Sequence, residues 1–124
     1  MHFKLIRYLP LLCLGLVWPL TSPAAAHFNI LLYHHVSSTM PRSTSLTPAE
    51  FEGHLEYLKV NDYHVIDLAT AIASVKQGQP LPEKAIVITF DDAWRDIYLH
   101  GFPLLKQYDY PFTVFVNTDP VDQN

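Results

Sequence analysis

Two adjacent carboxylates, Asp91 and Asp92, are the residues of this sequence with the clearest capacity for chemistry. They follow a run of β-branched and aromatic residues, 86–90, that is typical of a strand buried on both faces. In α/β proteins, working side chains are placed where the carboxyl ends of parallel strands open onto loops. Two neighbouring acids there repel each other unless a metal, a cation or a shared proton relieves them. A solvated turn is the plain alternative.

The two acids can serve one site only if the backbone turns at the strand end. Within a regular strand, Asp91 and Asp92 would point to opposite faces of the sheet. After such a turn, one carboxylate would bind a divalent cation and the other would accept a proton from a bound water molecule. The residues alone do not say which acid has which task. The alternative for Asp92 is that it begins a turn or caps the next segment of the chain.

Polar residues also follow two other apolar runs. His34 and His35 follow the run 28–33, and Asn117 follows the run 112–116. Because the carboxyl ends of parallel strands meet at one edge of a sheet, we expect these residues and the two acids to share a rim. Adjacent imidazoles leave a strand in different directions, so one histidine is expected to face the rim and the other to pack or be solvated.

Aromatic residues near these strand ends could form a platform for sugar rings. Trp94 is the main candidate, with Tyr33, Tyr98 and Phe102 as further members. The alternative is that these rings are core residues. Other nearby titratable residues are assigned to surface, core or local contacts: His54, His64, His100, Arg95 and Asp96.

The surrounding segments predict an alternation of strands and helices. Strands are expected at 28–33, 64–66, 86–90 and 112–116, with helices at about 48–60, from 68 to before Gly78, and from about Pro103 to Tyr108. Thr47 and Glu50 form a capping-box pattern around Pro48, and Asp67 can cap the second helix. The order βα-βα-βα-β predicts an α/β fold with a parallel sheet and right-handed crossovers.

The composition predicts one small exported domain. With 124 residues, 49% of them apolar, the chain can form a core but is shorter than a complete (β/α) barrel of roughly 200 residues. Residues 1–26 have the pattern of a signal peptide, since Lys4 and Arg7 precede an apolar stretch and small residues end it. An uncleaved membrane anchor is the alternative. The only cysteine, Cys13, lies within this stretch.

The net charge of the chain limits the classes of partner that we expect. Without residues 1–26 the chain carries six Lys or Arg against twelve Asp or Glu, a net charge of −6. That balance disfavours nucleic acid and anionic membrane surfaces as partners. It fits a neutral or cationic substrate, although an acidic balance also serves solubility. We expect a periplasmic protein or one associated with the cell envelope.

Three stretches carry a resemblance to a known family. They are Ile30-Leu31-Leu32-Tyr33-His34-His35-Val36, Thr47-Pro48-Ala49-Glu50-Phe51 and Ile88-Thr89-Phe90-Asp91-Asp92. Together they resemble the polysaccharide deacetylases with a NodB-like catalytic domain, and 110–116 matches the strand after that family's first catalytic motif. Within the family, residues 28–119 look most like the exported poly-β-1,6-N-acetylglucosamine deacetylases of biofilm exopolysaccharide systems.

The resemblance implies the N-terminal part of a distorted (β/α) barrel with parallel strands, and metal-dependent hydrolysis of N-acetyl groups on a glycan. Asp91 matches the family's catalytic base and Asp92 its metal-binding aspartate. His34 matches a position near the active site. The implied cofactor is a divalent metal ion, zinc or another transition metal. Ala93 stands where many members of the family have Gly.

Two further histidine ligands of the family come from a downstream motif, which does not occur before Asn124. Residues 27–124 are therefore expected to be the N-terminal portion of a deacetylase domain, inactive on its own. The expected partner is an N-acetylglucosamine polysaccharide, and association with export machinery is left open. The alternatives are a non-catalytic periplasmic glycan-binding module and a metal-dependent hydrolase acting on another amino-sugar glycan.

Overall fold

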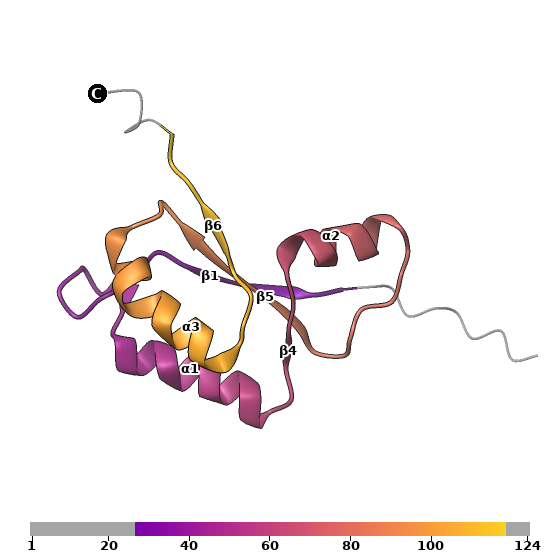
Figure 1. The fold of residues 1–124 in the computed structure, drawn as a ribbon, viewed down its shortest axis with the longest axis horizontal. Coiled ribbons are helices and arrows are strands. Elements are labelled where there is room, and N and C mark those ends of the chain that lie inside the picture. The colour runs from indigo at the N-terminus through magenta and orange to yellow at the C-terminus, as the bar shows by residue number, and fades with distance from the viewer. Residues whose placement is uncertain (1–26, 119–124) are drawn as a thin grey trace, which may run out of the picture.

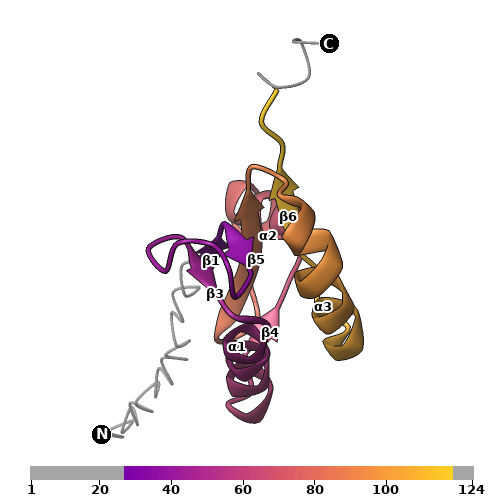
Figure 2. The same cartoon turned by 90° about the vertical axis from the view of Figure 1, so that its left-hand side faces the viewer.

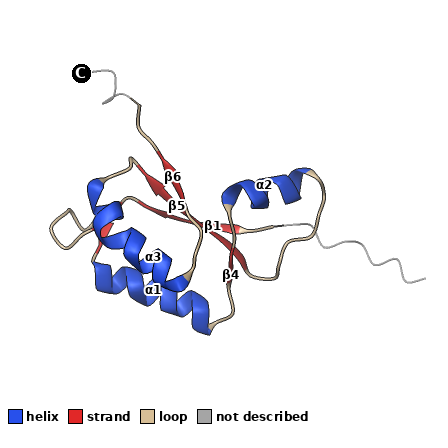
Figure 3. Ribbon diagram, viewed as in Figure 1, coloured by secondary structure: helices blue, strands red, loops and turns tan. Residues whose placement is uncertain are grey.

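The computed structural model describes residues 27–118, which form a parallel sheet with helices packed against it (Figures 1 and 3). The predicted signal peptide, 1–26, lies outside the described residues. The strands are β1 (Asn29–Tyr33), β2 (His35–Val36), β3 (Ser45–Leu46), β4 (His64–Val65), β5 (Ala85–Asp91) and β6 (Thr113–Phe115). The helices are α1 (Pro48–Val60), α2 (Leu68–Lys76), the π-helix η1 (Ile97–Gly101) and α3 (Phe102–Tyr108). No helix in this part of the chain is both long and apolar enough to cross a membrane.

β5 is the central strand of the main sheet. β1 runs along one of its edges, with Asn29 opposite Ile86. The other edge is shared by β4, next to Ala85, and by β6, next to Thr89 through Asp91. All of these pairings are parallel, so the carboxyl ends of β1, β5 and β6 open at one rim. The predicted α/β architecture with parallel strands is confirmed.

Both predicted helix starts are present. The Thr47 side chain accepts a hydrogen bond from the backbone N–H of Glu50, and the Glu50 carboxylate accepts one from the backbone N–H of Thr47 at 2.7 Å. This reciprocal arrangement satisfies two N–H groups that the first turn of a helix leaves unpaired. Asp67 caps α2 by accepting from the backbone N–H of Thr70 at 3.0 Å. Local side-chain chemistry therefore fixes where the two crossover helices begin.

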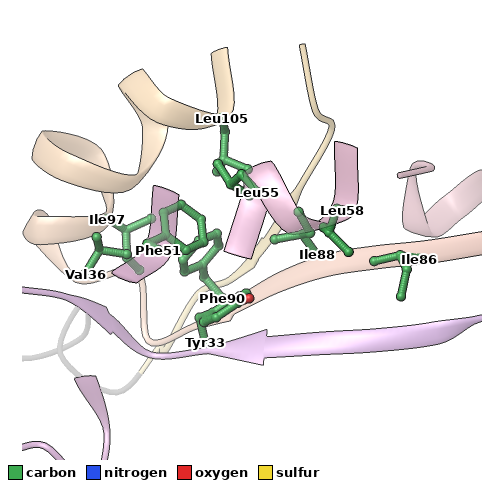
Figure 4. Close-up of a cluster of buried hydrophobic side chains, with 10 residues drawn as sticks. All are labelled: Tyr33, Val36, Phe51, Leu55, Leu58, Ile86, Ile88, Phe90, Ile97 and Leu105. Carbon is green, nitrogen blue, oxygen red and sulfur yellow. The ribbon is translucent and has the colours of Figure 1, made fainter. Parts of the chain in front are cut away.

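Alternate residues of β5 form the core together with α1 and α3, which lie side by side in Figure 2. Ile86, Ile88 and Phe90 are buried in this cluster (Figure 4). The Phe90 ring lies within 6 Å of three aromatic rings: Tyr33 at 5.6 Å, Phe51 at 5.8 Å and Phe112 at 5.9 Å. The cluster joins β1, β5, α1 and the segment before β6, and thereby holds the rim strands in register.

The expectation that 28–33 forms a buried strand is wrong for most of its length. Ile30 and Leu32 are 50% and 53% exposed, because β1 pairs only with β5 and the α1 and α3 helices cover the opposite face. Tyr33, in contrast, is buried, and its hydroxyl is hydrogen-bonded to Nδ1 of His54 at 3.1 Å. Burial raises the pKa of the Tyr33 phenol to about 12. Tyr33 is thus a core residue and no part of an exposed sugar platform.

Three local features were not predicted. β2 and β3 form a separate two-stranded parallel sheet, and a π-helix precedes α3. Gly101 ends that π-helix close to β2, where an added Cβ would lie 3.3 Å from Cγ2 of Val36. In α2 only Ala71 is fully buried, while Ile72 and Val75 are 40% and 45% exposed.

Candidate active site

The register of three strands gathers side chains on the face of the sheet opposite α1 and α3. Thr89 and Asp91 alternate with the core residues of β5, so they point to this second face. β1 places Leu32 beside Thr89, and β6 places Thr113 beside Thr89 and Phe115 beside Asp91. We name this surface, together with the residue that follows β1, the site face. Its residues are Leu32, His34, Thr89, Asp91, Thr113 and Phe115.

Asp91 and His34 meet at the rim of the site face. Asp91 is the last residue of β5, and its side chain is 35% exposed. The Nε2 atom of His34 lies 3.9 Å from Oδ2 of Asp91, and the His34 side chain is 37% exposed. That separation is too long for a hydrogen bond but short enough for attraction if the imidazole is protonated. Both groups are therefore accessible to a molecule that binds at this rim.

The backbone turns at the end of β5, as a shared site for the two acids requires. Asp92 and Ala93 have φ angles of 68° and 52°, both in the left-handed region. The Asp92 side chain is thereby released from the alternation of the strand and lies exposed. A left-handed conformation costs a residue with a Cβ roughly 1–2 kcal/mol, and Asp accepts it more readily than Ala. Glycine, which has no Cβ, would adopt the φ of position 93 without this cost.

His35 points away from the two acids. It is 5% exposed, and its Nδ1 atom lies 2.7 Å from Oδ2 of Asp96. The other Asp96 oxygen accepts a hydrogen bond from the backbone N–H of Val36 at 3.2 Å. We name these contacts of His35, Val36 and Asp96 the rim tie, because they join β2 to the segment after the two acids. His34 is thus the member of the pair that faces Asp91, a choice that the sequence leaves open.

The rim tie is the part of the site that sequence reasoning missed. The sequence assigns Asp96 to ordinary local contacts, yet its partner His35 lies 61 residues away in the chain. No local pattern signals a contact of that range. The ring of Trp94 lies 4.9 Å from the His35 ring at an interplanar angle of 30°, which adds a tilted ring contact to the tie.

Trp94 also lines an apolar depression beside the rim. The side chain is 45% exposed, and the depression has a volume of about 370 Å³. The other residues that line it are Ala93, Ile97, Tyr98, Phe102, Phe112 and Val114. Tyr98 and Phe102 stack on each other with ring centroids 6.1 Å apart. Asn117 is exposed two residues after the end of β6, and its assignment to the rim stays a prediction.

A metal centre is not complete in the described residues. Within 27–118, no group of three His, Cys, Asp or Glu side chains is placed to hold one ion. Catalytic zinc commonly takes three protein ligands. His34, Asp91 and Asp92 are suitable ligand types, but their arrangement does not fit a full coordination shell.

Comparison with known proteins identifies sequences that are similar to this chain. Residues 78–124 match the family model described as Polysaccharide deacetylase. The polysaccharide deacetylase candidate YxkH of Bacillus subtilis (strain 168) is 35% identical over 91 residues, which are 73% of this chain and 32% of the relative. The poly-β-1,6-N-acetyl-D-glucosamine N-deacetylase of Staphylococcus aureus (strain MSSA476) is 30% identical over 99 residues, which are 80% of this chain and 34% of the relative.

The fold has solved counterparts as well. A de-N-acetylase from Aggregatibacter actinomycetemcomitans superposes with a TM-score of 0.69 at 27% identity, covering 78% of this chain and 40% of the other. The chain spans about a third of the length of the two curated relatives described above. The sequence comparison and the fold comparison therefore both find deacetylases as similar proteins, over the part of those proteins that this chain covers.

Proposed function

Because this chain is related to the polysaccharide deacetylases in sequence and in fold, we propose that it serves the hydrolysis of N-acetyl groups on an exopolysaccharide. The substrate we propose is poly-β-1,6-N-acetylglucosamine, the glycan named for the Staphylococcus aureus relative. The setting is the export of a biofilm matrix, with the protein in the periplasm or at the cell envelope. Contact with the export machinery is part of this proposal.

One observation carries the proposal: Asp91 ends the central strand at an open rim, on the same face as His34 and 3.9 Å from it. A carboxylate in this position can accept a proton from a water molecule whose oxygen attacks the acetyl carbonyl carbon. The carbon–nitrogen bond then breaks, the acetyl group leaves as acetate, and the nitrogen receives a proton and departs as the amine. We propose Asp91 as the proton acceptor. His34, His35, Trp94 and Asn117 belong to the surrounding rim.

We propose Asp92 as one ligand of a divalent metal ion, zinc or another transition metal. Its exposed position after the left-handed turn supports this role, since the side chain is directed by the turn rather than by the strand. The remaining ligands would come from residues outside the described range. In this proposal residues 27–124 form the N-terminal portion of a deacetylase domain, and this portion alone releases no acetate.

The first test measures acetate release by the natural protein, purified with all of the chain that its gene encodes. Oligomers of N-acetylglucosamine with β-1,6 and with β-1,4 linkages are compared. Faster release from the β-1,6 oligomer is expected. Faster release from the β-1,4 oligomer would leave a deacetylase but reassign its glycan. Absence of release from both would contradict the proposed function.

Replacement of Asp91 and replacement of Asp92 should reduce the activity of that protein in different ways. Asp91→Asn removes the proton acceptor, so the turnover number should fall at least about 10²–10⁴-fold, the usual worth of general-base assistance. Added metal should not restore it. Asp92→Asn should weaken metal binding, and excess metal should recover part of the activity. Metal content is measured for both variants, with Asp62→Asn as an exposed control away from the rim. Loss of metal from Asp91→Asn alone would reverse the two roles.

A second candidate function is glycan binding without catalysis. The half-exposed Trp94 and the aromatic residues of the depression beside it favour this alternative, because flat rings stack on the apolar faces of sugars. It predicts binding of glucosamine oligomers that a chelator does not weaken, with no release of acetate. Trp94→Ala should then reduce binding. Soluble, folded protein that binds no glycan would exclude it.

A further inference from the structure

The turn after β5 adopts a conformation that its residues do not favour. Asp92 and Ala93 are consecutive, and both have φ angles in the left-handed region. Residues with a Cβ keep such angles only where the surrounding structure imposes them, and such residues cluster at functional sites. Both side chains are exposed, so neither is held by burial in the core. The conformation is therefore imposed from the two ends of the segment.

The main sheet fixes the end at which the chain enters the turn. Phe90 is fully buried and is paired with Tyr33 of β1 on one side and with Val114 of β6 on the other. Asp91 is still paired with Phe115 of β6. Because β5 has a neighbour along both edges here, it cannot shift without breaking both pairings.

The rim tie fixes the end at which the chain leaves the turn. Asp96 lies directly before η1, and its two carboxylate oxygens contact Nδ1 of His35 at 2.7 Å and the backbone N–H of Val36 at 3.2 Å. At the other end of η1, Gly101 approaches Val36 so closely that an added Cβ would lie 3.3 Å from Cγ2 of that residue. β2 therefore contacts both ends of η1 and holds it in place.

The two members of the tie can affect a reaction only through the turn. His35 is 5% exposed, so it is too buried to contact a glycan itself. Each oxygen of Asp96 has its own hydrogen-bond partner, and hydrogen bonds to an ionised group are stronger than those between neutral groups. Trp94, which lies between the turn and Asp96, adds a ring contact to His35 at 4.9 Å. Loss of the tie would free the segment 92–96 to leave its strained conformation.

We propose that Asp96 and His35 are positioning residues for the reaction. They hold the turn after β5 in its left-handed conformation and thereby keep the Asp92 carboxylate at the rim next to Asp91. This inference rests on the proposed function, in which the two acids serve one site. Neither Asp96 nor His35 touches the substrate or the reacting atoms. A displacement of about 1 Å at an active site can cost on the order of 100-fold in rate, so the tie matters to turnover as well as to stability.

The test compares Asp96→Ala and Asp96→Asn in the natural protein, with acetate release from β-1,6-linked N-acetylglucosamine oligomers as the activity. Asp96→Ala removes both acceptor oxygens, so kcat should fall about 10- to 100-fold. Asp96→Asn keeps an oxygen that can accept from the Val36 N–H and gains an amide that can donate to Nδ1 of His35, so it should keep most of kcat. Arg95→Ala, an exposed neighbour, is the control and should leave kcat unchanged. An unchanged kcat in Asp96→Ala, or an equal loss in Asp96→Asn, would overturn the inference.

Amide hydrogen exchange separates positioning from a general effect on stability, and it does not depend on activity. The Val36 N–H donates to Asp96, and the Ile97 N–H donates to the carbonyl oxygen of Trp94 at 3.0 Å. In Asp96→Ala these two amides should exchange faster by a larger factor than the amides of 86–90 in β5, because the tie and the turn open locally. Acceleration by the same factor throughout would overturn the inference. Wild-type protein that releases no acetate would instead defeat the proposed function, so the two failures are distinguishable.

Discussion

The two faces of β5 differ sharply, although they alternate along the same seven residues. On the core face, Ile86, Ile88 and Phe90 are buried against α1, α3 and a group of aromatic rings. On the site face, the polar residues Thr89 and Asp91 lie between half-exposed Leu32 and Phe115. The comparison teaches that the aromatic cluster packs on one face, whereas the candidate chemistry lies at the carboxyl end of the other. Stability and activity should therefore respond to different mutations.

The largest expected effect is on the core face. Phe90→Ala removes a ring that contacts three other aromatic rings in a fully buried position, and should lower the free energy of unfolding by about 3–5 kcal/mol. Leu32→Ala, on the half-exposed site face, should cost about 1 kcal/mol or less. Urea unfolding of both variants measures the difference. Similar losses in the two variants would break the comparison between the faces.

The next effect concerns the rim tie, which joins β2 to the segment after the acids. Asp96→Ala leaves the buried His35 ring and the Val36 N–H without their acceptor, which should cost about 1–3 kcal/mol. Arg95→Ala, an exposed neighbour, should change stability by no more than about 0.5 kcal/mol. Chemical denaturation of the two variants is the measurement. Equal stability of the Asp96 and Arg95 variants would show that the rim tie does not hold the loop.

A smaller effect, in the stabilising direction, is expected at the turn after β5. Ala93 has a φ of 52°, a conformation that glycine adopts without the clash of a Cβ. Relief of that clash is partly offset by the greater freedom of glycine in the unfolded chain, so Ala93→Gly should gain about 0.5–1 kcal/mol. Thermal unfolding checks this. A loss of stability would mean that the methyl group of Ala93 makes a packing contact that outweighs the strain.

The smallest effect is a pH dependence at the start of α1. Hydrogen bonds from Arg42, at 2.7 Å, and from Thr47 lower the pKa of Glu50 to about 2. A lowered carboxyl pKa means that the stabilisation is present above the ordinary value of 4.5 and is lost as the pH falls toward 2. The pair is exposed and screened, so the effect is small. Glu50→Gln should be less stable than the wild type at pH 6 and equal to it near pH 2 in thermal unfolding.

Much of this fold could be predicted because its signals are local. Thr47 and Glu50 of the capping box are three residues apart in the chain, and so are Asp67 and Thr70 of the second cap. Both caps are present in the structure. The β-branched run of β5 identified the buried central strand. The position of Asp91 at the end of that strand followed directly. These features depend on backbone geometry that neighbouring residues determine.

The rest depends on residues far apart in the chain. The half-exposed face of β1 could not be predicted, because its burial depends on which strands and helices lie alongside it. The pairing of His35–Val36 with Ser45–Leu46 involves strands of two residues each, too short to give a periodic pattern. Nor could the sequence assign Asp96 to His35 or decide which histidine faces Asp91. Each of these results from tertiary contacts.

The pairing of β1 with β5 also sets the order in which the site can form. Asn29 pairs with Ile86, which lies 57 residues further along the chain. Closing a loop of that length costs chain entropy before any contact offsets it, and folds dominated by such pairings form slowly. His34 and Asp91 therefore approach each other only after this closure. Because β5 is hydrogen-bonded along both edges, its amide protons should be among the slowest to exchange with solvent. During folding, His34 and Asp91 should come together at the same time as these amide protons become protected from exchange.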